Sequence, residues 1–227
     1  MAPTKGKINH NLTLTVQTDT KNSTIFFTTK EQLILASASP RRLRFLEELG
    51  LTFTIEAARV DERPLAHETP REFVLRAATD KARAVAQHHP NAWVLGADTV
   101  VVLDNQILGK PVDEGDAKRL LALLAGRWHD VLTGFCLCKK DMPHLSAHAV
   151  ATAVKFVDFD DTIGAAYVQT GEPLDKAGAY GIQGKGGFLV ERINGSYSNV
   201  VGLPLAEVIE KLLQLGIIVP ASEGGRK

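Results

Sequence analysis

The chain has 227 residues, of which 44% are hydrophobic and 23% are charged, a composition typical of a globular protein with one large α/β unit or two small lobes. Its 26 basic residues balance 26 acidic residues, which excludes a net field that would draw the protein onto nucleic acid or an anionic membrane. The longest apolar runs fall short of the roughly 20 residues that span a bilayer, and the N-terminal residues lack the apolar core and cleavage site of a secretory signal. We therefore expect a cytoplasmic protein that binds neither membrane nor nucleic acid.

Residues 1–32 are polar and rich in Thr and Asn, with one alternating stretch, Leu12 to Val16, that is compatible with a marginal strand. Such a composition offers little apolar surface to bury. We interpret this segment as a poorly ordered N-terminal extension, residues 33–217 as the folded domain and residues 218–227 as a C-terminal tail.

Two helices of the domain have clear starting points. In SASPRR, Ser39 occupies an N-cap position and Pro40 the first helical turn. This helix is expected to end at Gly50, because glycine readily adopts the left-handed conformation that terminates helices. The capping box that begins at Thr69, in the sequence TPRE, predicts a second helix that continues toward Pro90.

The apolar run at residues 92–97 predicts a buried strand that ends at Asp98, so the carboxylate of Asp98 is expected at a strand edge. The remaining expected strands lie near residues 33–36, 51–55, 100–103, 106–108, 131–138, 151–157 and 187–193, and the remaining helices near residues 114–125, near 161–168 and from 204 onward. This order of elements predicts one α/β domain with a mixed sheet, divided into two lobes.

The start of the first helix carries the first candidate binding site. Ser37, Ser39, Arg41 and Arg42 stand where a strand turns into a helix, and free backbone N–H groups at such a turn favour an anion. Two guanidinium groups add forked donors that suit phosphate. An ordinary N-cap beside solvated arginines explains the same residues, so this motif alone leaves both interpretations open.

The second candidate is Asp98, in the sequence GADTVV. A carboxylate directly after a buried strand is fixed by the strand and exposed by the following turn, so it is suited to hold a divalent metal or to accept a proton from water. Asp61 and Glu62, in VDER, add further carboxylate oxygens. The alternative interpretations are an aspartate that caps local N–H groups and a charged surface turn.

Two further segments combine glycine with polar residues. The sequence DKAGAYGIQGKGG contains Asp175 and Gln183 among five glycines and lacks the Lys-Ser or Lys-Thr ending of a Walker loop. Its glycines allow the backbone to approach a ligand closely, and the amide of Gln183 can read a base edge, whereas a flexible hairpin loop is the alternative. The sequence INGSYSNVVGLP predicts a tight Asn-Gly turn before the last helix.

The chain carries eight motifs in a fixed order: ASASPRR, DER, KARA, GADTVV, LGKP, HDVLTG, DKAGAYGIQG and INGSYSNVVGLP. Together they resemble the Maf family of nucleotide pyrophosphatases, over a stretch from about Leu33 to Leu215 that leaves out the N-terminal extension. The resemblance implies two α/β lobes around an elongated mixed sheet with a central cleft. It also implies a divalent cation (Mg, Mn or Co), release of pyrophosphate from a nucleoside triphosphate, and a homodimer.

By position, the resemblance makes Asp98 the catalytic base, and it ties Arg41, Thr99 and Gln183 to substrate choice in the branch that prefers dTTP and UTP. It assigns phosphate binding to Ser37, Arg42, Lys81 and Lys110, and metal binding to Glu62, Asp98 and Asp175. The implied reaction is attack of water on the α-phosphorus of dTTP or UTP, with modified pyrimidine nucleotides as further candidates, to give the monophosphate and pyrophosphate.

Two other functions remain open. One is a nucleotide-binding regulatory protein of the same fold, linked to the arrest of cell division, which needs no carboxylate to activate water. The other is a pyrophosphatase for modified purine nucleotides such as inosine triphosphate. The intact Asp98 and the intact basic residues favour the enzyme over the regulator, and the GIQG sequence that contains Gln183 favours a pyrimidine substrate.

Overall fold

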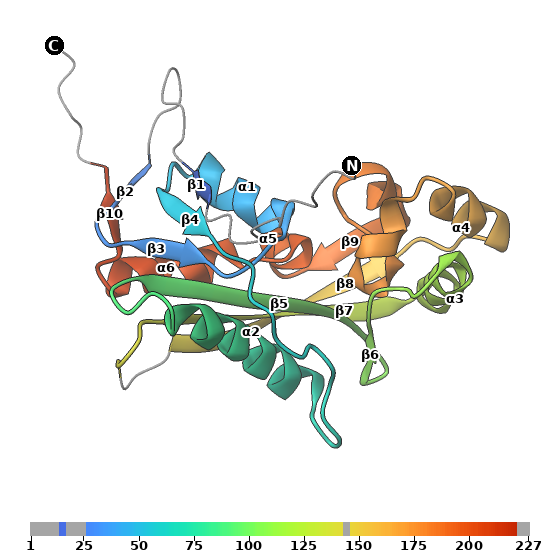
Figure 1. Ribbon diagram of the computed structural model, residues 1–227. Helices are drawn as coiled ribbons and strands as arrows, with labels where there is room; N and C mark the ends of the chain where they lie inside the picture. The colour runs from blue at the N-terminus through green and yellow to red at the C-terminus, as the bar shows by residue number, and fades with distance from the viewer. Residues whose placement is uncertain (1–13, 17–25, 143–145, 222–227) are drawn as a thin grey trace, which may run out of the picture.

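The computed structural model describes residues 14–16, 26–142 and 146–221. The other residues of the expected extension and tail lie outside this described part. Within it, eight strands form one sheet in the order β1-β4-β3-β5-β7-β8-β9, with β6 paired to β5, and β2 and β10 form a separate two-stranded ribbon (Figure 1).

The strands are β1 (Leu14–Val16), β2 (Phe27–Thr29), β3 (Leu33–Leu35), β4 (Phe53–Ile55), β5 (Trp93–Leu103), β6 (Gln106–Leu108), β7 (Trp128–Cys138), β8 (Ser146–Phe156), β9 (Val190–Asn194) and β10 (Ile218–Pro220). The α-helices are α1 (Pro40–Glu48), α2 (Pro70–Ala86), α3 (Glu114–Leu124), α4 (Asp161–Val168), α5 (Tyr197–Val201) and α6 (Leu205–Gln214). Short 3₁₀ turns cover Glu172–Asp175, Ala177–Ala179 and Gly184–Leu189.

The sheet is mixed, as predicted. Strand β3 runs parallel to both β4 and β5, whereas β5, β7, β8 and β9 pair antiparallel to one another in that order. Helix α2 covers one face of the long strands, α1, α5 and α6 lie on the other, and α3 and α4 lie at the far end (Figure 1). None of the helices in the described ranges is long and apolar enough to cross a membrane.

The structure confirms the predicted starts of α1 and α2, with one difference in how α1 is capped. At the start of α2, the side chain of Thr69 accepts from the backbone N–H of Glu72, and the side chain of Glu72 accepts from the backbone N–H of Thr69, which confirms the capping box. Gly50 follows α1 with a φ of 74°. Ser39 occupies the N-cap position of α1, but its side chain caps no backbone N–H.

The expectation that Asp98 follows the end of a strand is wrong, because β5 continues through it from Trp93 to Leu103. One edge of β5 pairs with β7 over most of its length. On the other edge, β3 pairs with residues 93–95 and β6 pairs with residues 101–103. The described strands therefore leave residues 96–100 without a neighbour on that side, and this gap opens the sheet beside Asp98.

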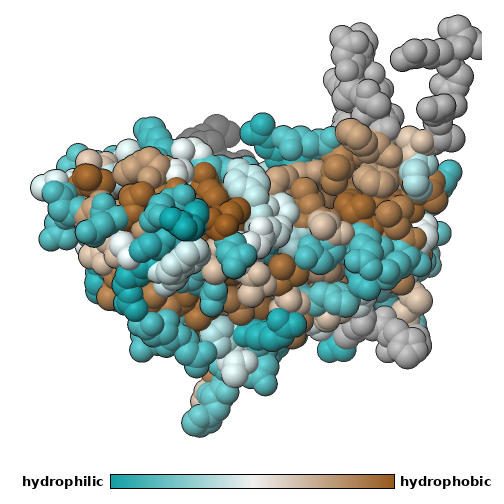
Figure 2. Space-filling view, turned by 180° about the vertical axis from the view of Figure 1, so that it is seen from behind, coloured by the Kyte–Doolittle hydropathy of each residue, from teal (hydrophilic) through white to brown (hydrophobic). Residues whose placement is uncertain are grey.

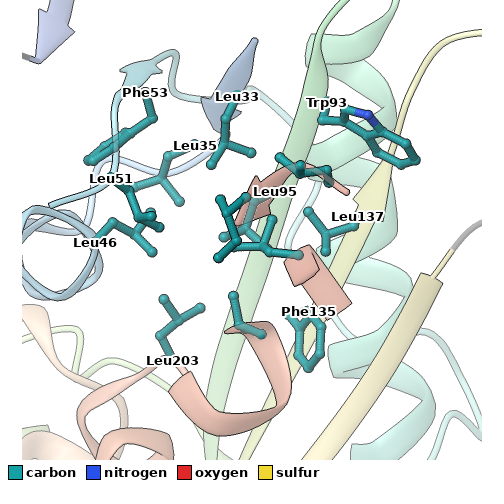
Figure 3. Close-up of a cluster of buried hydrophobic side chains, with 14 of the residues drawn as sticks. Leu33, Leu35, Leu46, Leu51, Phe53, Trp93, Leu95, Phe135, Leu137 and Leu203 are labelled. Carbon is teal, nitrogen blue, oxygen red and sulfur yellow. The ribbon is translucent and has the colours of Figure 1, made fainter. Parts of the chain in front are cut away.

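Two large apolar cores lie on either side of this gap, and β5 contributes to both. The first core, shown in Figure 3, includes Leu33, Leu35, Leu46, Leu51, Phe53, Trp93, Leu95, Phe135, Leu137 and Leu203. The second includes Val101, Leu103, Leu120, Leu121, Phe156, Tyr167 and Leu189. These cores correspond to the two expected lobes.

Two glycines allow α2 to lie directly on the backbones of β5 and β7. A Cβ atom at Gly96 would lie 2.3 Å from the carbonyl oxygen of Ala78, and one at Gly134 would lie 2.2 Å from that of Val74. Because both contacts are with helix backbone, no side chain fits at either position without displacing α2. The close approach brings Lys81, on the same helix, within reach of β5.

Strand pairing extends beyond residues 33–217 at both ends, so the folded unit is wider than the sequence suggested. Strand β2 pairs antiparallel with β10, where Ile218 is fully buried. Strand β1 lies within the stretch expected as a marginal strand and pairs antiparallel with β4 at the edge of the sheet.

Candidate active site

A cavity of about 560 Å³ lies beside the gap in the sheet. Its lining contains all ten residues that the family resemblance assigned to catalysis, phosphate, base choice or metal: Ser37, Arg41, Arg42, Glu62, Lys81, Asp98, Thr99, Lys110, Asp175 and Gln183. They come from the β3–α1 turn, the start of α1, the segment before α2, α2 itself, the middle of β5, the segment after β6 and the glycine-rich segment. Strand pairing around the gap therefore brings together residues that are far apart in the sequence.

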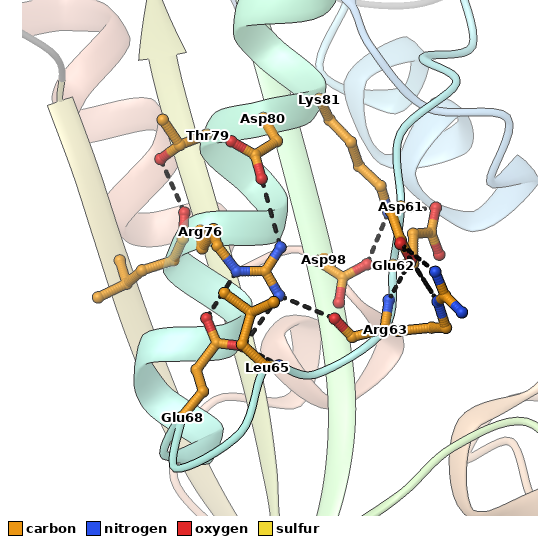
Figure 4. Close-up of polar contacts among 11 residues, drawn as sticks. Asp61, Glu62, Arg63, Leu65, Glu68, Arg76, Thr79, Asp80, Lys81 and Asp98 are labelled. Atoms are coloured by element: carbon orange, nitrogen blue, oxygen red, sulfur yellow. Dashed lines mark hydrogen bonds and ion pairs between the residues drawn. The ribbon is translucent and has the colours of Figure 1, made fainter.

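Asp98 and Lys81 form a buried ion pair in this cavity (Figure 4). Oδ1 of Asp98 accepts a hydrogen bond of 2.6 Å from Nζ of Lys81, and the two side chains are 11% and 9% exposed. Oε1 of Glu62 lies 2.9 Å from the same ammonium. Since Oδ2 of Asp98 has no hydrogen-bond partner among the described residues, it is free to contact water or a ligand.

Arg76 holds the segment that carries Glu62 against α2 (Figure 4). Its guanidinium donates to both carboxylate oxygens of Glu68, at 2.7 and 2.9 Å, and to the backbone carbonyl of Arg63 at 3.0 Å. The hydrogen bond from Arg76 lowers the pKa of Glu68. Because Arg63 is the residue after Glu62, these bonds fix the backbone next to one carboxylate of the site.

Arg42, expected to bind phosphate, is buried and donates largely to protein acceptors. Its Nε donates to the backbone carbonyl of Gly202 at 2.7 Å, and its Nη2 donates to Thr99 Oγ1 at 2.9 Å. Its Nη1 donates to two acceptors, Ser37 Oγ at 3.1 Å and the backbone carbonyl of Ala97 at 2.9 Å. Burial lowers the pKa of Arg42. The guanidinium therefore holds α1 against β5 by contacts with both neighbours of the candidate catalytic aspartate.

Arg41 and Asp175 connect two segments of the lining. Nη1 of Arg41, on α1, lies 3.8 Å from Oδ2 of Asp175, and Nζ of Lys176 donates to Asp175 Oδ1 at 2.6 Å. Burial opposes ionisation of Asp175, but the hydrogen bond from Lys176 and the charge of Arg41 keep its pKa below the usual value. Two cations thus neutralise this carboxylate.

The three carboxylates assigned to metal do not converge as a set. Across the described ranges, no group of three His, Cys, Asp or Glu side chains lies close enough together to hold a metal ion. Glu62 and Asp98 do approach each other, through Lys81, whereas Asp175 pairs with other cations. Mg²⁺ usually takes one or two protein carboxylates and completes its shell with substrate phosphates and water. Glu62 and Asp98 are therefore the carboxylates that fit a metal whose other ligands come from outside the protein.

The glycine-rich segment is anchored to the sheet, unlike a flexible hairpin. Tyr180 lines the cavity, and its hydroxyl lies 2.8 Å from Nε2 of His129 on β7. Burial lowers the pKa of His129 to about 4, so its imidazole is neutral near pH 7. Gln183 lies at the start of the last 3₁₀ turn, and its side-chain amide has no hydrogen-bond partner within the described part of the chain.

The INGSYSNVVGLP segment supports the backbone beside the cavity. Asn199 is fully buried, its Nδ2 donates to Thr152 Oγ1 at 3.0 Å, and its backbone N–H donates to Ser196 Oγ, which caps α5. Gly202 then adopts a φ of 125° and directs its carbonyl at the guanidinium described above. The sequence predicted the turn but missed α5 and Asn199, although Ser196 three residues earlier has the N-cap pattern.

Comparison with known proteins places these motifs in a family. The family model described as "Maf-like protein" matches residues 32–215. The dTTP/UTP pyrophosphatase of Desulfotalea psychrophila is 51% identical over 187 residues, which cover 82% of this chain and 95% of that protein. Proteins of the same name from Geobacter sulfurreducens and Myxococcus xanthus are 48% and 50% identical, over 83% of this chain and 99% and 94% of their own lengths. The chain belongs to the Maf-like protein family.

Proposed function

We propose that this chain hydrolyses dTTP and UTP to the monophosphate and pyrophosphate. The observation that carries the proposal is the buried Asp98, which has Oδ1 bonded to Lys81 and Oδ2 unpaired within the described residues, in a cavity that also contains Arg41 and Lys110. The names of the three relatives support the choice of substrates.

In the proposed reaction, water attacks the α-phosphorus. A new P–O bond forms while the bond to the bridging oxygen breaks, so pyrophosphate leaves with that oxygen. Oδ2 of Asp98 accepts the proton of the attacking water. Lys81 orients the carboxylate through Oδ1, and Arg41 and Lys110 bring positive charge to phosphate oxygens on which negative charge develops.

Glu62 is the carboxylate that would hold a divalent metal in this reaction, because Oδ1 of Asp98 accepts from Lys81 and its Oδ2 serves the attacking water. A bound Mg²⁺ supplies a Lewis acid that draws negative charge from the phosphate oxygens. Lys81 keeps the two carboxylates close together and compensates their charge before the nucleotide binds.

Gln183 is the residue that we assign to base choice. Uracil and thymine present an N3–H donor beside an O4 acceptor, and a primary amide offers the matching acceptor and donor, whereas cytosine presents the reversed pattern. The mismatch of one buried polar pair costs about 1–3 kcal/mol, which corresponds to about ten-fold to hundred-fold discrimination. The unpaired amide of Gln183 at the cavity is suited to this role.

We also propose that the functional unit is a homodimer. Apolar residues gather on the half of the rear face nearer to β2 and β10 (Figure 2), and surfaces of this kind are commonly buried between subunits. Analytical ultracentrifugation tests this assignment, because a monomer at micromolar concentration would contradict it.

A substrate panel tests the proposed activity. Purified protein is incubated with Mg²⁺ and, one at a time, with dTTP, UTP, CTP, the purine triphosphates and inosine triphosphate, and the products are separated by ion-exchange chromatography. We expect monophosphate and pyrophosphate, with the highest kcat/KM for dTTP and UTP. Diphosphate and orthophosphate as products would contradict the reaction, a preference for inosine triphosphate would favour a purine substrate, and binding without turnover would favour a regulatory protein.

A further inference from the structure

The glycine-rich segment around Gln183 has few side chains of its own with which to fix its shape. Gly181 and Gly184 flank the dipeptide that contains Gln183, and Gly186 follows shortly after. Gly184 has a φ of 79°, a left-handed conformation that other residues rarely adopt. The position of the Gln183 amide therefore depends on contacts that reach this segment from outside.

Those contacts come from Glu172 and Tyr167. Oε1 of Glu172 accepts two hydrogen bonds, from the backbone N–H of Gly186 at 3.0 Å and from the hydroxyl of Tyr167 at 2.9 Å. Oε2 of Glu172 accepts one hydrogen bond, from the backbone N–H of Lys185 at 2.9 Å. The oxygen of the same hydroxyl accepts from the backbone N–H of Gly181 at 3.3 Å. The Tyr167–Glu172 pair thus holds the backbone on both sides of Gln183.

Steric fit reinforces these hydrogen bonds. A Cβ atom at Gly184 would lie 2.8 Å from Oε2 of Glu172, and one at Gly186 would lie 2.3 Å from the hydroxyl oxygen of Tyr167. The ring of Tyr167 is buried in the second core, at the end of α4. The pair therefore connects the end of α4 to residues 181–187 and packs directly against two of their glycines.

The ionised form of Glu172 suits these partners. Burial opposes ionisation, but the hydrogen bonds from Gly186, Lys185 and Tyr167 keep the pKa of Glu172 below its usual value. A carboxylate only accepts hydrogen bonds, and the three groups that face it are donors. A glutamine at this position would direct an NH₂ group at one of those donors.

We propose that Glu172, together with Tyr167, is a positioning residue that holds the backbone around Gln183 and so places its amide against the base edge, where the amide sets the preference for uracil and thymine over cytosine. The inference rests on the proposed function, and it adds two residues that influence base selectivity without contacting the base. Selectivity needs this support, because the amide distinguishes the two donor and acceptor patterns only while the backbone keeps it within hydrogen-bond distance of the base edge.

The test compares kcat/KM for UTP and CTP in the wild type, Glu172→Gln, Tyr167→Phe, Gln183→Ala and the control Glu191→Gln. Glu191 is an exposed carboxylate on β9 that pairs with Arg192 outside the cavity lining. We expect the UTP-to-CTP ratio to fall by about ten-fold in Glu172→Gln, the factor expected for one mismatched polar pair. A smaller fall is expected in Tyr167→Phe, and none in the control.

Hydrogen exchange of the nucleotide-free proteins supplies the second measurement. We expect faster exchange at the amides of Lys185 and Gly186 in Glu172→Gln, with the exchange of β5 and β7 unchanged, which shows that the variant is folded. Faster exchange with an unchanged UTP-to-CTP ratio would overturn the inference while leaving the proposed function intact. A wild-type enzyme that does not distinguish UTP from CTP would overturn the base assignment and this inference with it.

Discussion

Nζ of Lys81 lies 2.6 Å from Oδ1 of Asp98, and the two side chains come from a helix and a strand whose backbones are in direct contact. Removing either partner leaves the other charge buried without its counter-ion, which lowers the free energy of unfolding. For Lys81 this loss of stability is smaller, because the carboxylate of Glu62 lies 2.9 Å from the same ammonium and still pairs with it. The pair therefore fixes one oxygen of Asp98 and leaves the other for chemistry.

Replacing Asp98 by Asn should abolish most turnover without unfolding the protein. The amide oxygen retains an acceptor for Lys81, but the side chain no longer accepts a proton, so kcat for UTP should fall by about 10²- to 10⁴-fold. The matched control is Asp104→Asn, in an exposed pair with Arg127 at the β5–β6 turn, which should leave kcat unchanged. Near-normal turnover in Asp98→Asn would remove this residue from the role of base.

Breaking the contact between Arg76 and Glu68 should weaken catalysis from outside the cavity. In Arg76→Met the segment that carries Glu62 loses its hydrogen bonds to α2, and hydrogen bonds to charged groups contribute about 1.5–3 kcal/mol. We expect kcat/KM for UTP to fall by about ten-fold and the exchange of amides 61–68 to rise.

The control for this variant is Arg63→Met, which breaks the exposed pair with Asp61 but retains the backbone carbonyl that Arg76 contacts. It should behave as the wild type in both measurements. Equal losses in the two variants would show that exposed charge near the cavity, and not the hydrogen bonds of Arg76, supports activity.

Gly96→Ala should destabilise the fold. Its Cβ would lie 2.3 Å from the carbonyl oxygen of Ala78 and 2.7 Å from the backbone nitrogen of Ala82, and overpacking of this kind costs about 1–3 kcal/mol. In the control Gly164→Ala, within α4, the nearest contact is 3.6 Å, so a gain of about 0.5–1 kcal/mol is expected from helix propensity. Urea denaturation measures the free energy of unfolding of both variants, and equal values would contradict the close contact between α2 and the sheet.

His129 should make stability depend on pH. Burial lowers its pKa from 6.5 to about 4, so the unfolded chain binds more protons than the folded one between these values, and stability falls as the pH drops through this window. Linkage predicts a loss of about 2 kcal/mol between about pH 7.5 and about pH 5. Urea denaturation at both pH values should show a smaller loss in His129→Gln, and an equal loss would indicate that other groups are responsible.

Local signals in the sequence were sufficient for the starts of α1 and α2. The capping box at Thr69 and Glu72 depends on neighbours along the chain, and it is present. The ten candidate residues, which the family motifs identified, all line one cavity. Their roles as base, phosphate ligands, metal ligands and base reader stay predictions.

Long-range pairing explains what the sequence did not predict. The gap beside Asp98 arises because β3 and β6 pair with different parts of the same edge of β5, a relationship that no property of the sequence GADTVV encodes. One of the four acceptors of Arg42 is the carbonyl of Gly202, 160 residues away. The apolar run around β5 therefore predicted a strand correctly but placed its end too early.

The β2–β10 ribbon brings the two ends of the segment from Phe26 to Ala221 together. The backbone N–H of Ala221 donates to the carbonyl of Phe26 at 3.0 Å, so the described segment between them begins and ends at the same place. Circular permutation succeeds where original ends are close and new ends fall in exposed turns. A protein made of residues 105–221 joined by a short linker to residues 26–104 would thus retain the cavity, because the packing of these elements does not depend on their order along the chain.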